Sequence, residues 1–571
     1  MIEKMSKYSF ILLPSGKEGF LEKLQELGLV DITRSEKPVD ERSSELFDRI
    51  AARKLLISDI EKGSDYTLRL LQESLAALRA EAGSIRVWGE WDREALARTG
   101  ISLHFYCVPA KKYNPEWEKD YAIQIVESVG NCWFVIAGDK AGFPVKELPA
   151  PTKDLAVLEA DISRLEDDER NYRESLEARK AELPALRREL ARMEEDFSRA
   201  LASAAAEGAA EGSLCVFEGF APSEDDASLR EAFDAMDIVW FAEKASVEDN
   251  PPISFRNNRF VKMFELLTDM YGRPAYNGFD PTPFIAVFFL LFFAFCMGDA
   301  GYGIILIIIG WLLGRGEGMK DLSPLVMTLG AGTVLVGFFF HTFFSMDIAE
   351  WGIFAPIKGI FLPSKIAGYD GTMILSLAIG VLHLCLAMVI KTVVATKQRG
   401  FLGSLGVWGW TLLIVGGVAV AAFALAGVLD KEITQLAVIV LGVVSGAGIF
   451  LFNDIHRNPL ANIGSGLWET YNTVTGLLGD VLSYLRLYAL GLAGAMLGKA
   501  FNDIGAMVLG DGSSFISWIP FILIVLIGHV LNIAMAALGA FVHPLRLNFL
   551  EFFKNSGYEA AGRNYNPLKK Q

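Results

Sequence analysis

Residues 467–509 read LWETYNTVTGLLGDVLSYLRLYALGLAGAMLGKAFNDIGAMVL, a run of 43 residues that is mostly apolar. As one helix the run would measure on the order of 65 Å, about twice the hydrocarbon thickness of a bilayer. It must therefore be strongly tilted or broken. Small residues recur along it and would let another helix approach closely: Gly476, Gly479, Ser483, Gly491, Gly494 and Gly498. Their spacing alone leaves open whether that helix belongs to this chain or to a partner.

Arg486 is the residue of this run that most favours a function. A central arginine in lipid costs about 2.5–3.5 kcal/mol on insertion scales, so such residues mark functional sites by default. Arg486 is far from both ends of the run, which argues against a snorkelling side chain. Its charged neighbour is Asp480, and we expect its partner to be an anion from elsewhere.

A second arginine, Arg546, follows in the stretch VHPLRLNFLE at 542–551. Near the end of a span it is either functional or an interfacial anchor. Polar residues around both arginines are candidates for a hydrated path, although each could instead be a packing residue: Glu469, Asn472, Asp480, His529, Asn532, His543 and Glu551. Asp299 and His383 are weaker candidates, because a glycine-rich turn or a structural hydrogen bond would explain them.

Six further apolar segments surround this run and predict an all-α membrane domain at 283–555. These segments are Phe284–Leu313, Pro324–Phe344, Thr372–Val394, Leu405–Leu429, Ile433–Phe452 and Phe515–Phe541, the last continuing toward Phe553. With the long run they make seven segments. If each crossed once from a cytoplasmic N-terminus, the C-terminus would lie outside.

The distribution of positive charge contradicts seven crossings. The loops and tail that would then lie outside hold ten cations: Arg315, Lys320, Lys391, Lys397, Arg399, Arg457, Lys554, Arg563, Lys569 and Lys570. The opposite loops hold three: Lys358, Lys365 and Lys431. The positive-inside rule places the ten in the cytoplasm. We therefore predict that the first segment folds back at the glycines of 298–303, which gives eight crossings and cytoplasmic termini, with 556–571 as a cytoplasmic tail.

Up to about Pro252 the chain is charged, and its strand and helix patterns predict α/β lobes. A strand–helix–strand pattern in 1–39 returns in 210–250, and together they predict one proximal ferredoxin-like lobe. Residues 85–149 predict a second, distal α/β lobe with strands at Ser102–Val108 and Cys132–Ala137. Residues 251–282 form a linker. The N-terminus has too short an apolar run for a signal peptide, so we expect this half to stay in the cytoplasm.

Residues 40–84 and 150–209 predict a long antiparallel coiled coil that joins the two lobes, so the soluble half is α+β. In the second stretch, apolar residues from Leu158 to Phe197 follow alternating steps of four and three. Asp154–Leu201 as one helix would reach roughly 70 Å, with a kink at Pro184. The first stretch is broken near Lys62–Ser64. Plain helix packing is the alternative, and it would still give an elongated hairpin.

Composition and motifs exclude several functions. The net charge of −15 gives no basic face for nucleic acid. The five cysteines form no CxxC pair, so neither a zinc site nor a disulfide framework is predicted. No GxxxxGK[ST], HExxH or GxSxG motif occurs, so we expect that this chain does not hydrolyse ATP and holds no cofactor.

Three motifs resemble a known family, the large membrane subunit of V-type and archaeal-type ATPases (subunit a in eukaryotes, subunit I in prokaryotes). They are GDAGYG at 298–303, SYLRLYALGLA at 483–493 and GAFVHPLRLNFLEFF at 539–553. The resemblance extends over nearly the whole chain. It implies a non-hydrolytic stator subunit of an ion-translocating ATPase in the cell membrane, with eight spans and two long tilted helices that face a rotor proteolipid ring.

The resemblance also implies roles for residues and partners. Arg486 and Arg546 match the paired membrane arginines of the family, and the soluble arm would hold peripheral stalks and contact the central-stalk cap subunit. Gly494 and Ala536 stand where eukaryotic members carry a histidine and a glutamate, so the half-channels can differ. Whether the ion is H⁺ or Na⁺, and whether the complex makes or uses ATP, stays open. The competing hypotheses are a free-standing ion-coupled secondary transporter and a membrane-anchored coiled-coil scaffold.

Overall fold

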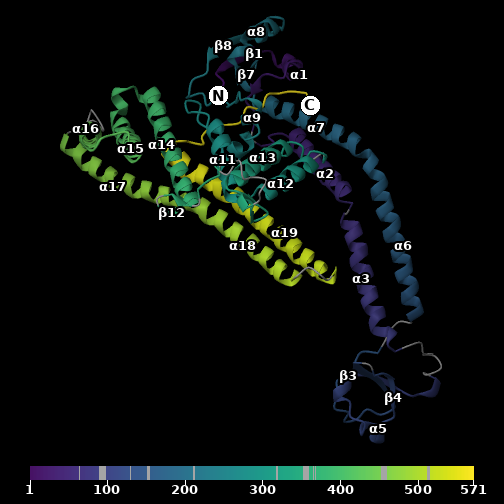
Figure 1. Ribbon diagram of the computed structural model, residues 1–571. Helices are drawn as coiled ribbons and strands as arrows, with labels where there is room; N and C mark the ends of the chain where they lie inside the picture. The colour runs from purple at the N-terminus through teal and green to yellow at the C-terminus, as the bar shows by residue number, and fades with distance from the viewer. Residues whose placement is uncertain are drawn as a thin grey trace. The chain divides into compact units, whose positions relative to one another are not determined.

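The computed structural model describes residues 1–571 except 36, 64, 89–97, 129, 151–154, 210–212, 317–318, 351–358, 360, 364, 367, 452–458, 511–514 and 571. The described chain is mostly helical, with a few small sheets (Figure 1). It divides into two compact units. One unit comprises Met1–Leu12, Leu29–Ile32 and Glu218–Pro567, and the other comprises Leu13–Gly28, Thr33–Phe217 and Leu568–Gln571.

The second unit contains a long helical hairpin. Its helices are α2 (Glu41–Lys62), α3 (Tyr66–Arg86), α6 (Leu155–Arg179) and α7 (Leu183–Ala204). The break predicted near Lys62–Ser64 is present, because α2 ends at Gly63 with a positive φ of 60°, which glycine adopts without strain. A 3₁₀ turn over Lys180–Glu182 interrupts the second arm just before Pro184.

Ion pairs along the hairpin show that its two arms are antiparallel. Residue numbers rise along one arm as they fall along the other in the pairs Arg53–Glu189, Arg79–Glu166 and Arg86–Glu159. The buried contacts are sparse, with Leu158 fully buried against Ala82 and Ile85. The hairpin is therefore established, whereas the supercoil of a coiled coil stays a prediction.

The second unit also contains α1 (Lys17–Leu27), β6 (Glu207–Ala209) and a small antiparallel sheet. The sheet has the order β3-β5-β4, from β3 (Leu103–Pro109), β4 (Ile123–Glu127) and β5 (Asn131–Ala137). β3 and β5 coincide with the two predicted strands. β4 was not predicted. It lies at an edge of the sheet and is mostly exposed, and it is too short to show the alternating apolar pattern of a half-buried strand clearly.

A second sheet has the order β2-β7-β1-β8, from β1 (Met5–Leu12), β2 (Asp31–Ile32), β7 (Leu214–Pro222) and β8 (Val239–Lys244). Strands from the two predicted repeats are interleaved, which is the arrangement that a ferredoxin-like lobe needs. Within the first unit, α8 (Asp226–Asp234) packs on this sheet through Phe233, whose ring lies 5.0 Å from that of Phe10.

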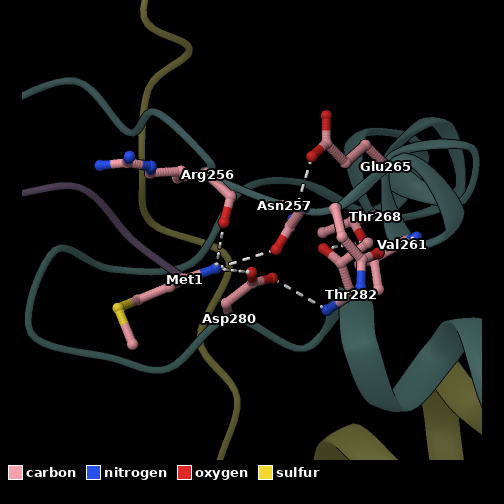
Figure 2. Close-up of polar contacts among 9 residues, drawn as sticks. Met1, Arg256, Asn257, Val261, Glu265, Thr268, Asp280 and Thr282 are labelled. Carbon is pink, nitrogen blue, oxygen red and sulfur yellow. Dashed lines mark hydrogen bonds and ion pairs between the residues drawn. The ribbon is translucent and has the colours of Figure 1, made fainter.

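Residues 250–282 connect this sheet to the apolar helices through α9 (Arg259–Lys262) and α10 (Glu265–Tyr271). Figure 2 shows that Asp280 accepts a hydrogen bond from the Met1 amino group at 2.5 Å and from the Thr282 backbone N–H at 2.9 Å. The buried hydroxyls of Thr268 and Thr282 lie 3.0 Å apart. The bonds of Asp280 tie the start of the first apolar helix to the N-terminus, and the hydroxyl contact ties it to α10.

Five helices of the described residues are long and apolar enough to cross a membrane. They are Gly371–Arg399 (α14), Leu402–Leu425 (which includes α15, Leu405–Leu425), Lys431–Phe450 (α16), Asn462–Leu509 (within α17, Pro459–Ser483, and α18, Leu485–Leu509) and Ile516–Ser556 (within α19, Phe515–Arg546, and α20, Phe553–Ser556). Three shorter apolar helices precede them: α11 (Thr282–Met297), α12 (Ala300–Leu313) and α13 (Ser323–Phe339).

The first apolar segment reverses direction at the predicted glycines. Gly298 has a φ of +54° and ends α11, and Asp299 caps the start of α12. Gly332 of α13 lies against Leu290 of α11. Two other glycines of α13 lie against α12, Gly330 against Gly303 and Gly337 against Ala300. α11 therefore runs parallel to α13, whereas α12 runs antiparallel to it. The reversal agrees with the prediction that this segment folds back, although it does not test the number of crossings.

Candidate functional site

The long apolar run of the sequence is broken at Tyr484, between α17 and α18. Tyr484 is fully buried, and a methyl group added at Gly380 of α14 would overlap its ring. Its hydroxyl lies 2.9 Å from Nδ1 of His383, whose imidazole stacks between the rings of Phe288 (4.0 Å) and Phe552 (4.6 Å). This anchored tyrosine fixes the break, so Arg486 lies in the first turn of α18.

Several side chains of the apolar helices have buried polar atoms without a hydrogen-bond partner. Among the described residues they include Nη1 of Arg486, Nδ1 of His543, Oδ1 of Asn548, Oε2 of Glu551 and Nε2 of His383. His543 lies within electrostatic range of Arg486 and Arg546, and Glu551 within that of Tyr484. Since most buried polar groups of folded proteins are hydrogen-bonded, the unpaired atoms of Arg486 and His543 make this part of the chain a candidate site.

Arg546 is exposed, at the end of α19 and directly before a π-helix over Leu547–Phe552. The π-helix follows Pro544, and Asn548 Nδ2 donates to the Pro544 carbonyl at 2.9 Å. π-helical turns are rare and often mark functional sites. Both Asn548 and Glu551 are buried within it. Sequence reasoning named Glu551 but missed the π-helix and Asn548.

Three sequence-predicted residues line one cavity of about 270 Å³. Glu469, Asn472 and Asp480 follow one face of α17, opposite Lys391 of α14 and Lys554 of α20. Asp480 lies 3.2 Å from the Lys554 ammonium group and accepts a hydrogen bond from Asn555 at 2.8 Å. The cavity is thus polar and contains charges of both signs.

A second cavity of about 210 Å³ lies along α18. Tyr488, Gly491 and Ala495 line it, together with His341 and Thr342 from the segment after α13. On the α17–α18 run, one cavity therefore ends at Asp480 and the other begins at Tyr488, roughly 12 Å apart along a helix. Arg486 lies between them in the sequence.

His529 and Asn532 belong to a hydrogen-bonded network and are not among the residues that line either of these cavities. α18 and α19 lie side by side and antiparallel (Figure 1), with Gly494 and Gly498 against Asn532, and Gly528 against Phe501. Asn532 and His529 both contact the Tyr302 hydroxyl, at 2.8 and 2.7 Å. His529 also bonds Asn502 at 3.0 Å. Tyr302 lies in the GDAGYG motif at 298–303, but its contacts with His529 and Asn532 could not be predicted because these residues are distant in the chain.

The chain matches the model of the V-type ATPase 116kDa subunit family over residues 152–320 and 468–570. It is 25% identical over an alignment of 640 residues to V-type ATP synthase subunit I of Borreliella burgdorferi, with all of both chains covered. The chain is thus similar to this family over 152–320 and 468–570, and to a subunit I over its whole length. The resemblance stated from the three motifs is thereby confirmed.

Archaeal relatives match a smaller part of the chain at higher identity. A-type ATP synthase subunit I of Methanocaldococcus jannaschii is 31% identical over 389 residues, and that of Pyrococcus horikoshii is 33% identical over 331 residues. These matches cover 62% and 56% of this chain, and 54% and 48% of the relatives. The chain thus spans about half the length of these archaeal relatives. The second matched region of the 116kDa subunit family contains Arg486, Arg546 and the network residues of α18 and α19.

Proposed function

We propose that this chain is the membrane stator subunit of a rotary V/A-type ATPase, in which it forms two ion half-channels against a rotor proteolipid ring. The 116kDa subunit family and its relatives, whose names identify them as ATP synthase subunits, support a place in such a complex. The observation that carries the finer proposal is Arg486. Its buried Nη1 lacks a partner, and it lies between two cavities on one helical run.

The proposed mechanism follows from the chemistry of a guanidinium group. Arginine is not deprotonated in proteins, so a rotor carboxylate that reaches Arg486 is favoured in its charged form and releases its ion. When the rotor turns the carboxylate into lipid, the charged form is disfavoured and must reload from the other half-channel. An ion moved against 100 mV costs about 2.3 kcal/mol, so a leak past Arg486 would waste the gradient.

Different polar residues would have different roles along the proposed ion path. Glu469, Asn472 and Asp480 would line the half-channel that contains the Asp480–Lys554 ion pair. His543, Arg546 and Glu551 would contribute charge and unpaired polar atoms beside Arg486, and His529 and Asn532 would act on the opposite side. The transported ion is H⁺ or Na⁺, and no cofactor is proposed.

We further propose eight crossings, with both termini in the cytoplasm of a multi-pass cell-membrane protein. The reversal between α11 and α12 and the ten cations on one side support this topology. The segment after α20 returns to the N-terminal part of its unit, where Tyr565 N–H donates to the Ile253 carbonyl at 3.2 Å, which supports termini on one side. A reporter fused after residue 571 that is active only outside the cytoplasm would contradict the proposal.

The N-terminal hairpin is proposed as a coiled-coil arm, with residues 85–149 as its distal lobe and 1–39 plus 210–250 as its proximal lobe. Its antiparallel helices support a strut that holds peripheral-stalk subunits and contacts a central-stalk cap subunit. Replacing Leu165 and Leu190 with polar residues should weaken recovery of the stalk subunits while the membrane half stays inserted. Unchanged recovery would count against the arm.

Purification of the tagged chain in mild detergent tests the function. A rotary stator should recover a proteolipid ring and soluble ATPase subunits, and the complex should drive ion uptake into liposomes on addition of ATP. A free-standing secondary transporter would move ions without these subunits, and a scaffold would recover partners but move no ions. Either result would overturn the proposal.

A further inference from the structure

A large cavity of the first unit lies where β1, β8, residues 276–280 and the end of α14 meet, and the proposed ion path does not use it. Its volume is about 730 Å³, and Lys4, Lys244 and Lys397 are among the residues that line it. We propose that this cavity binds the phosphate headgroup of an anionic phospholipid. The inference goes beyond the proposed function, because it requires only that α14 crosses the membrane, as its length and composition allow.

The pairing of β1 with β8 places two of these lysines close together. Ser6 lies directly opposite Lys244 in this antiparallel pair. Lys4 precedes Ser6 by two residues, so the alternation of side chains puts Lys4 on the same face as Lys244 and diagonally across from it. The Lys4 carbonyl accepts a hydrogen bond from the Ser223 N–H at 2.8 Å, and Ser223 also lines the cavity. The backbone of Lys4 is therefore held beside the cavity.

The third lysine comes from a membrane helix. Lys397 lies in the last turn of α14, which has 29 residues. At about 1.5 Å per residue this helix reaches roughly 43 Å, the thickness of a bilayer that includes its headgroups. Gln398, the next residue, donates to the Asn277 carbonyl at 3.4 Å, which ties this end of α14 to the segment that lines the cavity. The cavity therefore lies at the level of lipid headgroups.

The three ammonium groups carry charge that the described part of the chain leaves unpaired. None of Lys4, Lys244 and Lys397 has an ion-pair partner among the described residues. Lys7 of β1 differs, since its ammonium group lies 3.1 Å from carboxylate oxygens of both Glu218 and Asp249. Like charges around one cavity repel one another, and an anion between them removes that repulsion. The cavity therefore favours a ligand with negative charge.

Two carboxylates, of Glu3 and Asp280, also line the cavity but do not cancel this charge. The Asp280 side chain is only 5% exposed. It accepts hydrogen bonds from the Met1 amino group and the Thr282 N–H (Figure 2), so its charge is already compensated. Glu3 then stands alone against the three lysines, and the lining keeps a net positive charge.

Tyr276 adds a neutral hydrogen-bond donor to the lining. Its hydroxyl accepts from the Met5 N–H at 2.8 Å, and its own hydrogen has no acceptor among the described residues. Ammonium and hydroxyl groups both donate to phosphate oxygens. A free phosphate compound offers the same oxygens, but basic groups directly beside the end of a membrane helix are typical of sites for anionic lipid headgroups. The place of Lys397 at the end of α14 therefore favours a phospholipid.

The test is the binding of dioctanoyl phosphatidylglycerol to the full-length chain in mild detergent, followed by native mass spectrometry as the lipid concentration rises. We expect the wild type to bind this lipid more tightly than dioctanoyl phosphatidylcholine. Lys244→Gln and Lys397→Gln should each weaken the binding of phosphatidylglycerol roughly fivefold, the usual effect of one lysine near an anionic membrane surface. Lys262→Gln is the control, since it removes an exposed lysine of α9 that does not line the cavity, and it should bind like the wild type.

Three results would overturn the site or its ligand. Unchanged phosphatidylglycerol binding by both cavity variants, or an equal loss in Lys262→Gln, would overturn the site. Binding of radiolabelled inorganic phosphate that both variants lose, while phosphatidylglycerol binding stays unchanged, would overturn the lipid and assign the cavity to a soluble phosphate compound. Wild-type binding of phosphatidylglycerol should also weaken as salt screens the lysines, and binding that does not depend on salt would contradict the proposal without any variant. The measurement needs no rotor ring, so its result does not depend on the rotary function.

Discussion

Asp299→Asn should destabilise the first unit, which contains the apolar helices, more than any other single carboxylate-to-amide change tested in it. Asp299 is 4% exposed, and its Oδ1 accepts three backbone hydrogen bonds while Oδ2 accepts the one from Ser345. Bonds to a charged acceptor contribute about 1.5–3 kcal/mol each, against about 0.5–1.5 for neutral ones. The amide retains three weaker bonds and turns an N–H group toward the Ser345 N–H. We expect a loss of roughly 4–7 kcal/mol.

The assay is thermal unfolding of the purified chain in nanodiscs, where this loss should lower the midpoint by ~5–10 °C. Asp430→Asn is the matched control, since Asp430 precedes α16, is exposed and makes no side-chain capping bond. Proteolysis in the 341–347 loop should increase for Asp299→Asn alone. Equal midpoints for the two variants would refute the reasoning that Asp299 holds this loop, in which Phe344 and Ser345 have positive φ values of 48° and 57°.

Two further predictions concern the N-terminal hairpin and the residues that follow β8. Leu158→Ala should destabilise the N-terminal hairpin by roughly 2–5 kcal/mol, because Leu158 is fully buried, and limited proteolysis should be faster. Val157→Ala is the control, since the Val157 side chain is 53% exposed and its loss should change the proteolysis rate little. Equal proteolysis rates for the two variants would contradict the packing of Leu158. The backbone N–H and hydroxyl of Ser246, followed by Lys7, lower the pKa of Asp249 to about 2. Its stabilisation is therefore full above the unfolded pKa of about 3.9 and is lost as the pH falls toward 2. The difference in unfolding free energy between wild type and Asp249→Asn should shrink over that range, and a constant difference would contradict it.

Much of the fold could be predicted because its breaks have local causes. Gly63 and Gly298 adopt positive φ values where the sequence predicted a break and a reversal, since glycine pays no steric cost there. The length of the long run predicted a strong tilt or a break, and the structure has a one-residue interruption at Tyr484 between α17 and α18. The position of that break was not predictable, because it depends on Gly380 and His383 of another helix.

The candidate site was predictable where its residues share one helix face. Glu469, Asn472 and Asp480 are three and eight residues apart, which places them on one side of α17, and they line one cavity. His529 and Asn532 were named as polar residues, yet their partner Tyr302 is more than 200 residues away in the chain. Such pairs, like the stacking of His383 on Phe552, arise from tertiary packing and leave no pattern in the sequence.

The most direct test of the central claim is ATP-driven ion uptake by a complex that carries Arg486→Ala. The complex must first be shown to retain its rotor ring and soluble head. Arg315→Ala, which removes an arginine from the connection between α12 and α13 that stacks on Trp311, serves as the control. We predict no uptake for Arg486→Ala, severe impairment for Arg486→Lys because lysine lacks the planar fork, and normal uptake for Arg315→Ala. Normal ATP-coupled uptake by the intact Arg486→Ala complex would contradict the account.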